Sequence, residues 1–416
     1  MEYYPRKIDE KLSAWIPRKE TILLKGPRQS GKTTTFRHLQ ETLGGTYLTL
    51  EDEDIRQSFE KNPTEFIKRY TQGKKTTLFI DEAQYSNNAG KHLKLIYDHF
   101  SESTKLFVTG SGSFDIKVQI GKHLVGRAVY FELHPLDFEE FLLWKAKDLH
   151  AIYQDYKQAL LQFITEQQNT IQTEPLFLQE FRTLLQEYLL YGGYPAIVKE
   201  NAIEIKKELL KNLTRTYLEK DVFFFFHIMH LEKFNKILHY LSFTNGSLLE
   251  ISSLMRELHM DFKTIENYLS VLSNTSIITL LPPYHKNLTT ELKKAKKIYF
   301  NDLGMRNSIL NNFLPLESRM DKGVLLKNYI FNQLIRTIDG TTHYWRTTGK
   351  AEVDFIINHE NHLVPIEVKS QTKTGKSFLS FLKTYKPKRA VVFTEKEFTI
   401  KHIDHTTVVF LPHFFI

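Results

Sequence analysis

The chain has 416 residues, of which 41% are apolar and 25% are charged, and these ordinary values for a globular protein allow two or three domains. It contains no cysteine, which excludes disulfides, thiolate metal sites and cysteine nucleophiles and is typical of the cytoplasm. The net charge of +8 mildly favours an anionic partner such as nucleic acid. The first 19 residues are polar and no apolar run is long enough to span a bilayer, so we expect neither a signal peptide nor a membrane segment.

The N-terminal third predicts an α/β fold, namely a doubly wound parallel sheet, because short apolar stretches alternate there with helical patterns. The expected strands are residues 21–25, 46–50, 76–80, 105–109 and 128–133. In such a sheet, ligands bind at the carboxyl ends of the strands. We therefore expect the functional residues of this region to follow the strands.

A glycine-bearing loop follows the first expected strand and opens a helix. It reads Gly26-Pro27-Arg28-Gln29-Ser30-Gly31-Lys32-Thr33-Thr34. Glycines at this spacing let the main chain approach a ligand, and the N–H groups at a helix start attract phosphate. The loop predicts an ATP site in which Lys32 reaches the β- and γ-phosphates and Thr33 holds Mg²⁺. The alternative is an ordinary turn before a helix.

Two carboxylates, Asp81 and Glu82, end the third expected strand. Asp81 is expected in the Mg²⁺ shell, and Glu82 is expected to polarise the attacking water as a general base. The pair could also cap a helix. Its place about fifty residues after the phosphate loop favours hydrolysis.

Further candidates lie at the end of the fourth expected strand and just before the fifth. A small polar side chain, Thr109 or Ser111, could sense the γ-phosphate, although a simple turn explains both residues equally well. Arg127 is a candidate for neutralising the charge that develops during phosphoryl transfer. It could act within its own chain or on a neighbouring copy, so an oligomer is possible.

The C-terminal hundred residues contain a second group of candidates. We expect strands at residues 343–346, 353–358, 363–370 and 389–394, with helices at 323–338 and 377–385. Asp354 and Glu367 lie on neighbouring expected strands and could hold Mg²⁺ or Mn²⁺, and Lys369 falls on the same strand face as Glu367. This arrangement is typical of metal-dependent phosphodiester cleavage, although alternating strands also produce it by chance.

The middle of the chain predicts helices and then a mixed segment. Residues 142–230 have helical patterns, and 231–310 predict three helices and two strands, an order typical of a winged helix. Basic residues gather on the expected wing, at Lys286, Lys293, Lys294, Lys296 and Lys297. They suit contacts with a phosphate backbone, although a solvated charged loop is an equal alternative.

Several stretches together resemble a known family. They are the phosphate loop, Phe79-Ile80-Asp81-Glu82-Ala83-Gln84, Thr109-Gly110-Ser111-Gly112-Ser113, Gly126-Arg127, Leu133-His134-Pro135-Leu136-Asp137-Phe138-Glu139-Glu140-Phe141 and Tyr191-Gly192-Gly193-Tyr194-Pro195. They resemble prokaryotic AAA-type P-loop ATPases that carry a C-terminal domain of unknown function with a restriction-endonuclease-like motif, PD-(D/E)XK. The resemblance implies an ATPase with an additional catalytic glutamate, a winged-helix segment and a nuclease-like domain. The implied domains are residues 1–141, 142–230, 231–310 and 320–416.

One residue departs from that family. Its members generally carry Gly-x-Leu-x-Glu-Asn in the first helix of the C-terminal domain, whereas this chain reads Gly323-Val324-Leu325-Leu326-Lys327-Asn328. Lys327 therefore replaces an acid beside the expected metal site, which puts cleavage in doubt.

Two functions follow from these patterns. The first is an ATP-hydrolysing protein that gates or positions a nuclease-like domain acting on DNA, with RNA not excluded. The alternative is a nucleotide-switched module that binds DNA or a protein through an inactive nuclease-like domain. A small-molecule kinase is disfavoured because Asp81 and Glu82 suit water activation and most of the chain would have no role.

Overall fold

The computed structural model describes residues 3–72, 74–110, 121–165, 167–225, 228, 230–284, 295–369, 374–395 and 398–416. The chain forms two compact units, each built from separate stretches of sequence. Unit 1 contains Met1–Pro135, Arg215–Leu231 and Asn267–Ile277, and unit 2 contains Leu136–Thr214, Glu232–Glu266 and Ile278–Ile416. The four consecutive segments expected from the sequence are thus distributed over two units.

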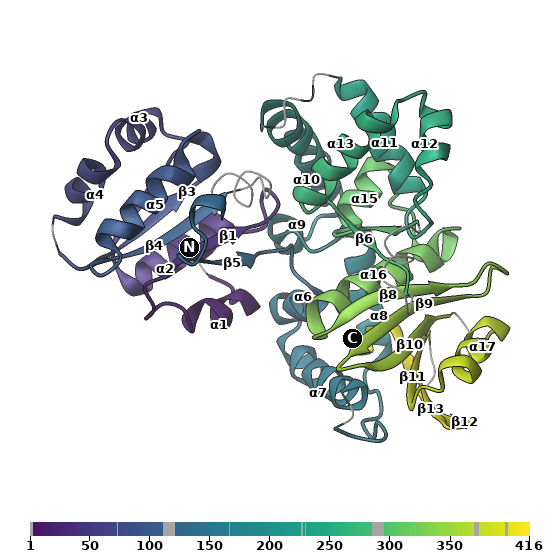
Figure 1. Cartoon of the computed structure of the whole chain (residues 1–416). Helices are drawn as coiled ribbons and strands as arrows, with labels where there is room; N and C mark the ends of the chain where they lie inside the picture. The colour runs from purple at the N-terminus through teal and green to yellow at the C-terminus, as the bar shows by residue number, and fades with distance from the viewer. Residues whose placement is uncertain are drawn as a thin grey trace. The chain divides into compact units, whose positions relative to one another are not determined.

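Unit 1 contains the predicted parallel sheet (Figure 1). Its strands are β1 (Thr21–Lys25), β2 (Thr46–Thr49), β3 (Thr76–Asp81), β4 (Thr104–Gly110) and β5 (Ala128–Glu132). Their order is β2-β3-β4-β1-β5, and every pairing is parallel. All five expected strands are confirmed within a residue or two. The phosphate loop leaves β1, which has a neighbour on each side.

Helices cover both faces of this sheet. They are α1 (Lys7–Ser13), α2 (Lys32–Leu43), α3 (Glu53–Lys61), α4 (Pro63–Thr71) and α5 (Ala89–Phe100). Successive strand residues point to opposite faces, so Ile22 and Leu24 pack with Phe36 of α2, whereas Leu23 packs in a second core with Ile96 of α5. The central strands β1 and β4 are mostly apolar because both of their faces are buried.

Unit 2 contains a six-stranded mixed sheet. Its strands are β8 (Thr341–Arg346), β9 (Glu352–His359), β10 (His362–Val368), β11 (Arg389–Thr394), β12 (Thr399–Ile403) and β13 (Thr406–Pro412). Their order is β12-β13-β11-β10-β9-β8. The pairing of β9 with β10 is antiparallel, and the pairings of β11 with β10 and β13 are parallel. The first four strands were predicted, and β12 and β13 were not.

Helices from distant stretches complete unit 2. They are α6 (Phe138–Lys145), α7 (Lys147–Ile164), α8 (Leu178–Tyr191), α9 (Pro195–Lys199), α10 (Ile203–Thr216), α15 (Leu303–Ile309), α16 (Lys322–Thr337) and α17 (Lys376–Tyr385), of which α10 runs into unit 1. A capping box starts α6, because Glu140 N–H donates to Asp137 and Asp137 N–H donates to Glu140.

One hydrophobic core joins these helices to the sheet of unit 2. Tyr156 of α7 stacks on Phe415 with ring centroids 4.7 Å apart, and Phe181 of α8 stacks on Phe414 at 4.8 Å. Tyr329 of α16 packs edge-to-face on Phe138 of α6 at 5.6 Å. Residues from 138 onward thus share their core with the C-terminal strands.

The expected winged-helix segment shows the predicted order of elements. It contains α11 (Leu231–Phe243), α12 (Ile251–Leu258), α13 (Phe262–Asn274) and the antiparallel pair β6 (Ile278–Leu281) and β7 (Lys297–Phe300). The segment contributes to both units, and its winged-helix character stays a prediction.

The expected basic wing needs one correction. Lys297 is 3% exposed and forms an ion pair with Glu352 in unit 2, so it does not face solvent as the sequence predicted. Lys296 is exposed, and the other three lysines lie outside the described residues.

Within the described ranges, the helices that are long enough to cross a bilayer are not apolar enough to do so.

Candidate functional site

The phosphate loop joins β1 to α2 and is shaped by its glycines. A Cβ at Gly26 would lie 2.2 Å from the carbonyl oxygen of Leu133, so no other residue fits there. Gly31 precedes α2 with φ of 105°. Lys32 is 5% exposed, and its Nζ donates to the carbonyl oxygens of Gly26 and Pro27, at 2.9 Å each. The buried ammonium group thus lies inside the curve of the loop, as expected of a phosphate-binding lysine.

The Asp81 carboxylate, at the end of β3, is the centre of a polar cluster. It is 2% exposed and accepts hydrogen bonds from the Thr33 hydroxyl at 2.7 Å and from Glu82 N–H at 3.0 Å. The hydroxyls of Tyr47 and Thr109 donate to it as well. The structure therefore brings together Thr33 and Asp81, the two groups that the sequence placed beside Mg²⁺. The sequence analysis did not predict Tyr47 as a member of this cluster. Burial and, next, the charge of Asp81 raise the pKa of Tyr47, so its hydroxyl keeps its proton and remains a hydrogen-bond donor.

Glu82 follows Asp81 in the left-handed region, with φ of 55°. Burial raises the pKa of its carboxyl above the usual value, and the positive charges of Lys32 and Arg28 oppose that rise. Gln84 donates a hydrogen bond to the same carboxylate. A carboxylate with a raised pKa, held beside the phosphate-binding lysine, has the properties of a general base.

Two buried charged residues at the phosphate loop were missed by the sequence analysis. Asp221, in the π-helical segment Tyr217–Phe225, is 2% exposed and accepts a hydrogen bond from Arg28 Nε at 3.4 Å. Burial lowers the pKa of Arg28, but the nearby negative charges, that of Asp221 first and that of Glu82 next, together outweigh this effect and the pKa is raised. Arg6 Nη1 donates to the carbonyl oxygen of Ser30 at 3.0 Å. The sequence signal that could have identified Asp221 is its position directly before the apolar run at residues 222–226.

Arg127 lies away from the nucleotide site of its own chain. It directly precedes β5, and its carbonyl oxygen accepts a hydrogen bond from Thr21 N–H at the start of β1. The phosphate loop follows the other end of β1, roughly 13 Å away along a five-residue strand. Arg127 also forms an ion pair with Asp98 of α5. The expectation that Arg127 lies at the nucleotide edge is therefore wrong within one chain. The other candidate after the fourth strand, Ser111, lies outside the described residues.

The expected carboxylate pair of unit 2 is assembled as the sequence predicted. Asp354 on β9 and Glu367 on β10 are 3% and 5% exposed, and Asp354 N–H donates to Glu367 Oε2 at 3.4 Å. Lys369 Nζ lies 2.7 Å from Glu367 Oε1. Burial raises the pKa of Glu367 to about 7, the charge of Asp354 adds to the rise, and Lys369 opposes it.

Lys327 of α16 completes this cluster. Its ammonium group donates to Asp354 Oδ1, while Val368 N–H donates to Oδ2 at 3.0 Å. Burial lowers the pKa of Lys327, but the charge and hydrogen bond of Asp354 together with the charges of Glu367 and Glu352 outweigh that effect and raise the pKa, so the lysine stays charged. The two carboxylates thus already face the ammonium groups of Lys327 and Lys369.

This donor set does not fit a divalent cation. Hard cations such as Mg²⁺ bind to negatively charged oxygens, whereas each carboxylate here is already paired with an ammonium group, Asp354 with Lys327 and Glu367 with Lys369, and these two positive charges would repel the cation. Across the described part of the chain, no group of three or more histidine, aspartate or glutamate residues is placed to hold a metal ion.

Three known families match consecutive parts of the chain. Residues 18–142 match an AAA domain, residues 182–315 match a domain of unknown function (DUF8612), and residues 322–414 match another domain of unknown function (DUF4143).

Relatives match most of the chain. The uncharacterized protein MJ1544 of Methanocaldococcus jannaschii is 27% identical over 369 residues, which are 86% of this chain and 75% of that protein. The uncharacterized protein MJ1637 of the same organism is 22% identical over 414 residues, 94% of this chain and 84% of that protein. An uncharacterized protein of Haemophilus influenzae is 22% identical over 426 residues, 96% of each.

Among solved structures, the Walker-type ATPase PABY2304 of Pyrococcus abyssi matches with a TM-score of 0.47 and 15% identity, over 74% of this chain and 96% of that one. By the family matches given above, the chain contains an AAA-type P-loop ATPase domain at residues 18–142 and a DUF4143 domain at residues 322–414.

Proposed function

We propose that unit 1 binds and hydrolyses ATP. The observation that carries the proposal is the hydrogen bond from Thr33 to Asp81, with Glu82 directly beside it. This bond joins the phosphate loop to the end of β3, where a hydrolase needs its metal ligand and its general base.

Each residue has a chemical role in this proposal. Residues 26–34 cradle the phosphates with main-chain N–H groups, and Lys32 exchanges its bonds to Gly26 and Pro27 for phosphate oxygens. Thr33 and Asp81 fit Mg²⁺ because their oxygens already lie 2.7 Å apart. Thr33 and Asp81 would hold this ion, whose positive charge would offset the negative charge that develops on the phosphates. Glu82 orients the attacking water and accepts its proton. Arg127, which is remote in its own chain, can serve only a neighbouring copy.

The experiment compares Lys32→Met and Glu82→Gln with two controls at exposed positions, Lys94→Met and Glu102→Gln. We expect Lys32→Met to lose ATP binding, and Glu82→Gln to bind ATP and to hydrolyse it at least about a hundredfold more slowly. Fluorescent-nucleotide titration measures the binding, and phosphate release measures the hydrolysis. Undiminished hydrolysis by Glu82→Gln would exclude that residue as the base.

For the DUF4143 domain, we propose a nucleotide-switched binding role without cleavage. The ion pair of Lys327 with Asp354 supports this reading, because the acid pair is charge-balanced without a metal. The net charge of +8 favours nucleic acid as the ligand. We expect DNA binding whose affinity falls steeply with salt and changes between the ATP-bound and ADP-bound protein. Binding to no nucleic acid at low salt would point to a protein partner instead.

The competing function is an ATP-gated nuclease. It requires Lys327 to leave Asp354 so that Asp354 and Glu367 can take Mg²⁺ or Mn²⁺, with Lys369 beside them. Incubation of wild type and Asp354→Ala with linear, circular and single-stranded DNA and with RNA, with ATP and Mn²⁺, separates the two functions. Nicking by wild type that is lost in Asp354→Ala would overturn the binding-only proposal.

A further inference from the structure

A cavity of about 300 Å³ lies within unit 2 and is lined by other residues than those of the two sites described above. Helix α8 lines it with Leu185 and Leu189, α16 contributes Leu326, and the turn that follows β13 contributes Phe414. These side chains form an apolar lining. The volume is at the small end of the range for ligand-binding pockets, about 300 to 1,000 Å³.

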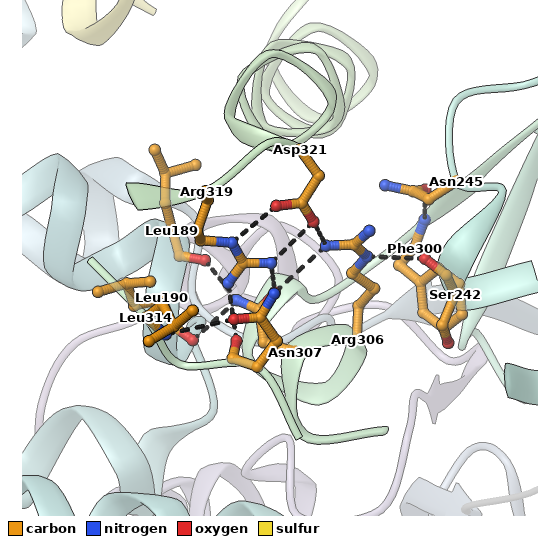
Figure 2. Close-up of polar contacts among 11 residues, drawn as sticks. Leu189, Leu190, Ser242, Asn245, Phe300, Arg306, Asn307, Leu314, Arg319 and Asp321 are labelled. Carbon is orange, nitrogen blue, oxygen red and sulfur yellow. Dashed lines mark hydrogen bonds and ion pairs between the residues drawn. The ribbon is translucent and has the colours of Figure 1, made fainter. Parts of the chain in front are cut away.

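The walls of this cavity are held by a buried network (Figure 2). Asn307 Nδ2 donates to the carbonyl oxygen of Leu189, at 2.9 Å, on the α8 wall. Arg319 forms an ion pair with Asp321 at 2.8 Å and donates to Asn307 Oδ1 at 3.0 Å. Asp321 directly precedes α16, so the network ties the two helical walls together. The cavity is therefore built by fixed elements.

Most charged groups on the lining have partners of their own. Lys322 forms an ion pair with Glu395 at 2.8 Å, and Gln186 donates to Glu317 at 2.7 Å. Arg182 is different, because its Nε is buried and none of the described residues accepts a hydrogen bond from this atom. A buried guanidinium N–H without an acceptor, next to an apolar lining, favours an anionic ligand, since a charge-assisted bond would replace the hydration that this N–H has lost.

His413 adds a second requirement. It lines the cavity and is 4% exposed. A hydrogen bond between its ring and the main chain of Lys369 raises the pKa of His413, which means that the ring donates this bond. Burial outweighs that bond and lowers the pKa to about 4, which leaves the imidazole neutral near pH 7. The other nitrogen, Nε2, is then an acceptor, and no described residue donates to it. A ligand with an O–H or N–H group would satisfy it.

We propose that this cavity is a binding site for a small organic acid. The carboxylate pairs with Arg182, the apolar body packs on the leucines and Phe414, and a hydroxyl or N–H group donates to His413. The site does not depend on the ATPase proposal. It lies beside α16, the helix that also carries Lys327, so an occupant would contact the element next to the acid pair.

Three probes of nearly equal size test the three requirements. 4-Hydroxyphenylacetate has the ring, the carboxylate and the hydroxyl, phenylacetate lacks the hydroxyl, and p-cresol lacks the carboxylate. Isothermal titration of the full chain should show saturable binding of 4-hydroxyphenylacetate. Both analogues should bind at least several-fold more weakly, p-cresol by about tenfold or more because it loses the charged bond. The proposal fails if none of the probes binds saturably, or if p-cresol binds as tightly as 4-hydroxyphenylacetate.

Variants locate the binding. Arg182→Gln should weaken 4-hydroxyphenylacetate about tenfold and leave p-cresol unchanged, whereas Lys383→Gln, at an exposed lysine of α17, should change neither. Lys32→Met should also bind the probe normally, which separates this site from the ATP site. Thermal unfolding confirms that each variant is folded. Equal affinity in wild type and folded Arg182→Gln would overturn the assignment.

Discussion

Lys327 donates a hydrogen bond to Asp354, and a lysine ammonium therefore supplies the positive charge that a metal ion supplies in a metal-dependent nuclease. The helix α16 that carries Lys327 packs against β10, where Glu367 lies. The acid pair is thus balanced from within the fold. Replacing Lys327 should change how this site responds to metal.

The first prediction concerns Lys327→Glu, which adds a third acid to Asp354 and Glu367. We expect the variant to be less stable than wild type without metal, because the added carboxylate would lie beside the buried carboxylates of Asp354 and Glu367 and repel them. Mn²⁺ should stabilise it, by about 2.7 kcal/mol at a hundredfold excess over the dissociation constant. Differential scanning fluorimetry with and without Mn²⁺ measures the shift. Lys327→Met is the matched control. Mn²⁺ should add little stability to this variant or to wild type. A gain of equal size in wild type would show that the ammonium does not block the metal.

The second prediction concerns the raised pKa of Glu367. The pKa is about 7 in the folded protein against an ordinary value of 4.5, so the folded state binds this proton more tightly. Its contribution to stability is therefore fully present below about pH 4.5 and is lost as the pH rises through about 7. Glu367→Gln should abolish this pH-dependent loss of stability. Urea denaturation between about pH 4.5 and pH 7 measures the free energy of unfolding of both proteins. Glu180→Gln, at an exposed glutamate of the same unit, should follow wild type at every pH.

The third prediction concerns Asp321, which pairs with both Arg306 and Arg319 (Figure 2). The side chains of these arginines are 1% and 0% exposed. Asp321→Asn would leave two buried guanidinium groups without an anion, so we expect a loss of about 3 kcal/mol or more in the free energy of unfolding. Chemical denaturation measures it. Asp404→Asn, the same change at an exposed turn, should cost less than about 0.5 kcal/mol. A small loss in both variants would mean that the network adds little to stability.

The fourth prediction concerns Asp221 beside the phosphate loop. Its carboxylate binds Arg28 and lies close enough to Lys32 to oppose the lowering of that lysine's pKa by burial. A fixed negative charge there repels the phosphates of ATP, so Asp221→Asn should tighten nucleotide binding, roughly tenfold. Glu219→Gln, an exposed change on the same segment, should have little effect. Weaker ATP binding in Asp221→Asn would indicate that the carboxylate orients Arg28 for the phosphates.

Local pattern was sufficient to predict the parts that depend on neighbouring residues in the chain. Buried parallel strands such as β1 are continuous apolar runs, and the loop after β1 has its own spacing rule, so both were predicted. The closeness of Thr33 and Asp81 followed because parallel strands end at one edge. The adjacent strands β9 and β10, which hold Asp354 and Glu367, were also predicted from their local sequence pattern.

Pairings between distant residues could not be predicted in this way. Arg28 and Asp221 are 193 residues apart, and Arg6 reaches Ser30 by a contact that has no periodic signal. Arg127 was placed at the wrong edge although it directly precedes the predicted strand, because a residue before a parallel strand lies at the opposite edge of the sheet from the phosphate loop. Lys297 was read as part of a basic cluster, whereas the partner that buries it, Glu352, is known only from the fold.

The shared core of unit 2 has a consequence for how this protein could have evolved. The DUF4143 stretch ends in Phe414, which stacks on Phe181 of α8, and Tyr329 packs on Phe138 of α6. A gene fragment that encoded residues 322–414 alone would leave these aromatic faces uncovered. The C-terminal domain and the helices from residue 138 to residue 191 are therefore expected to be inherited together, as one exchangeable module.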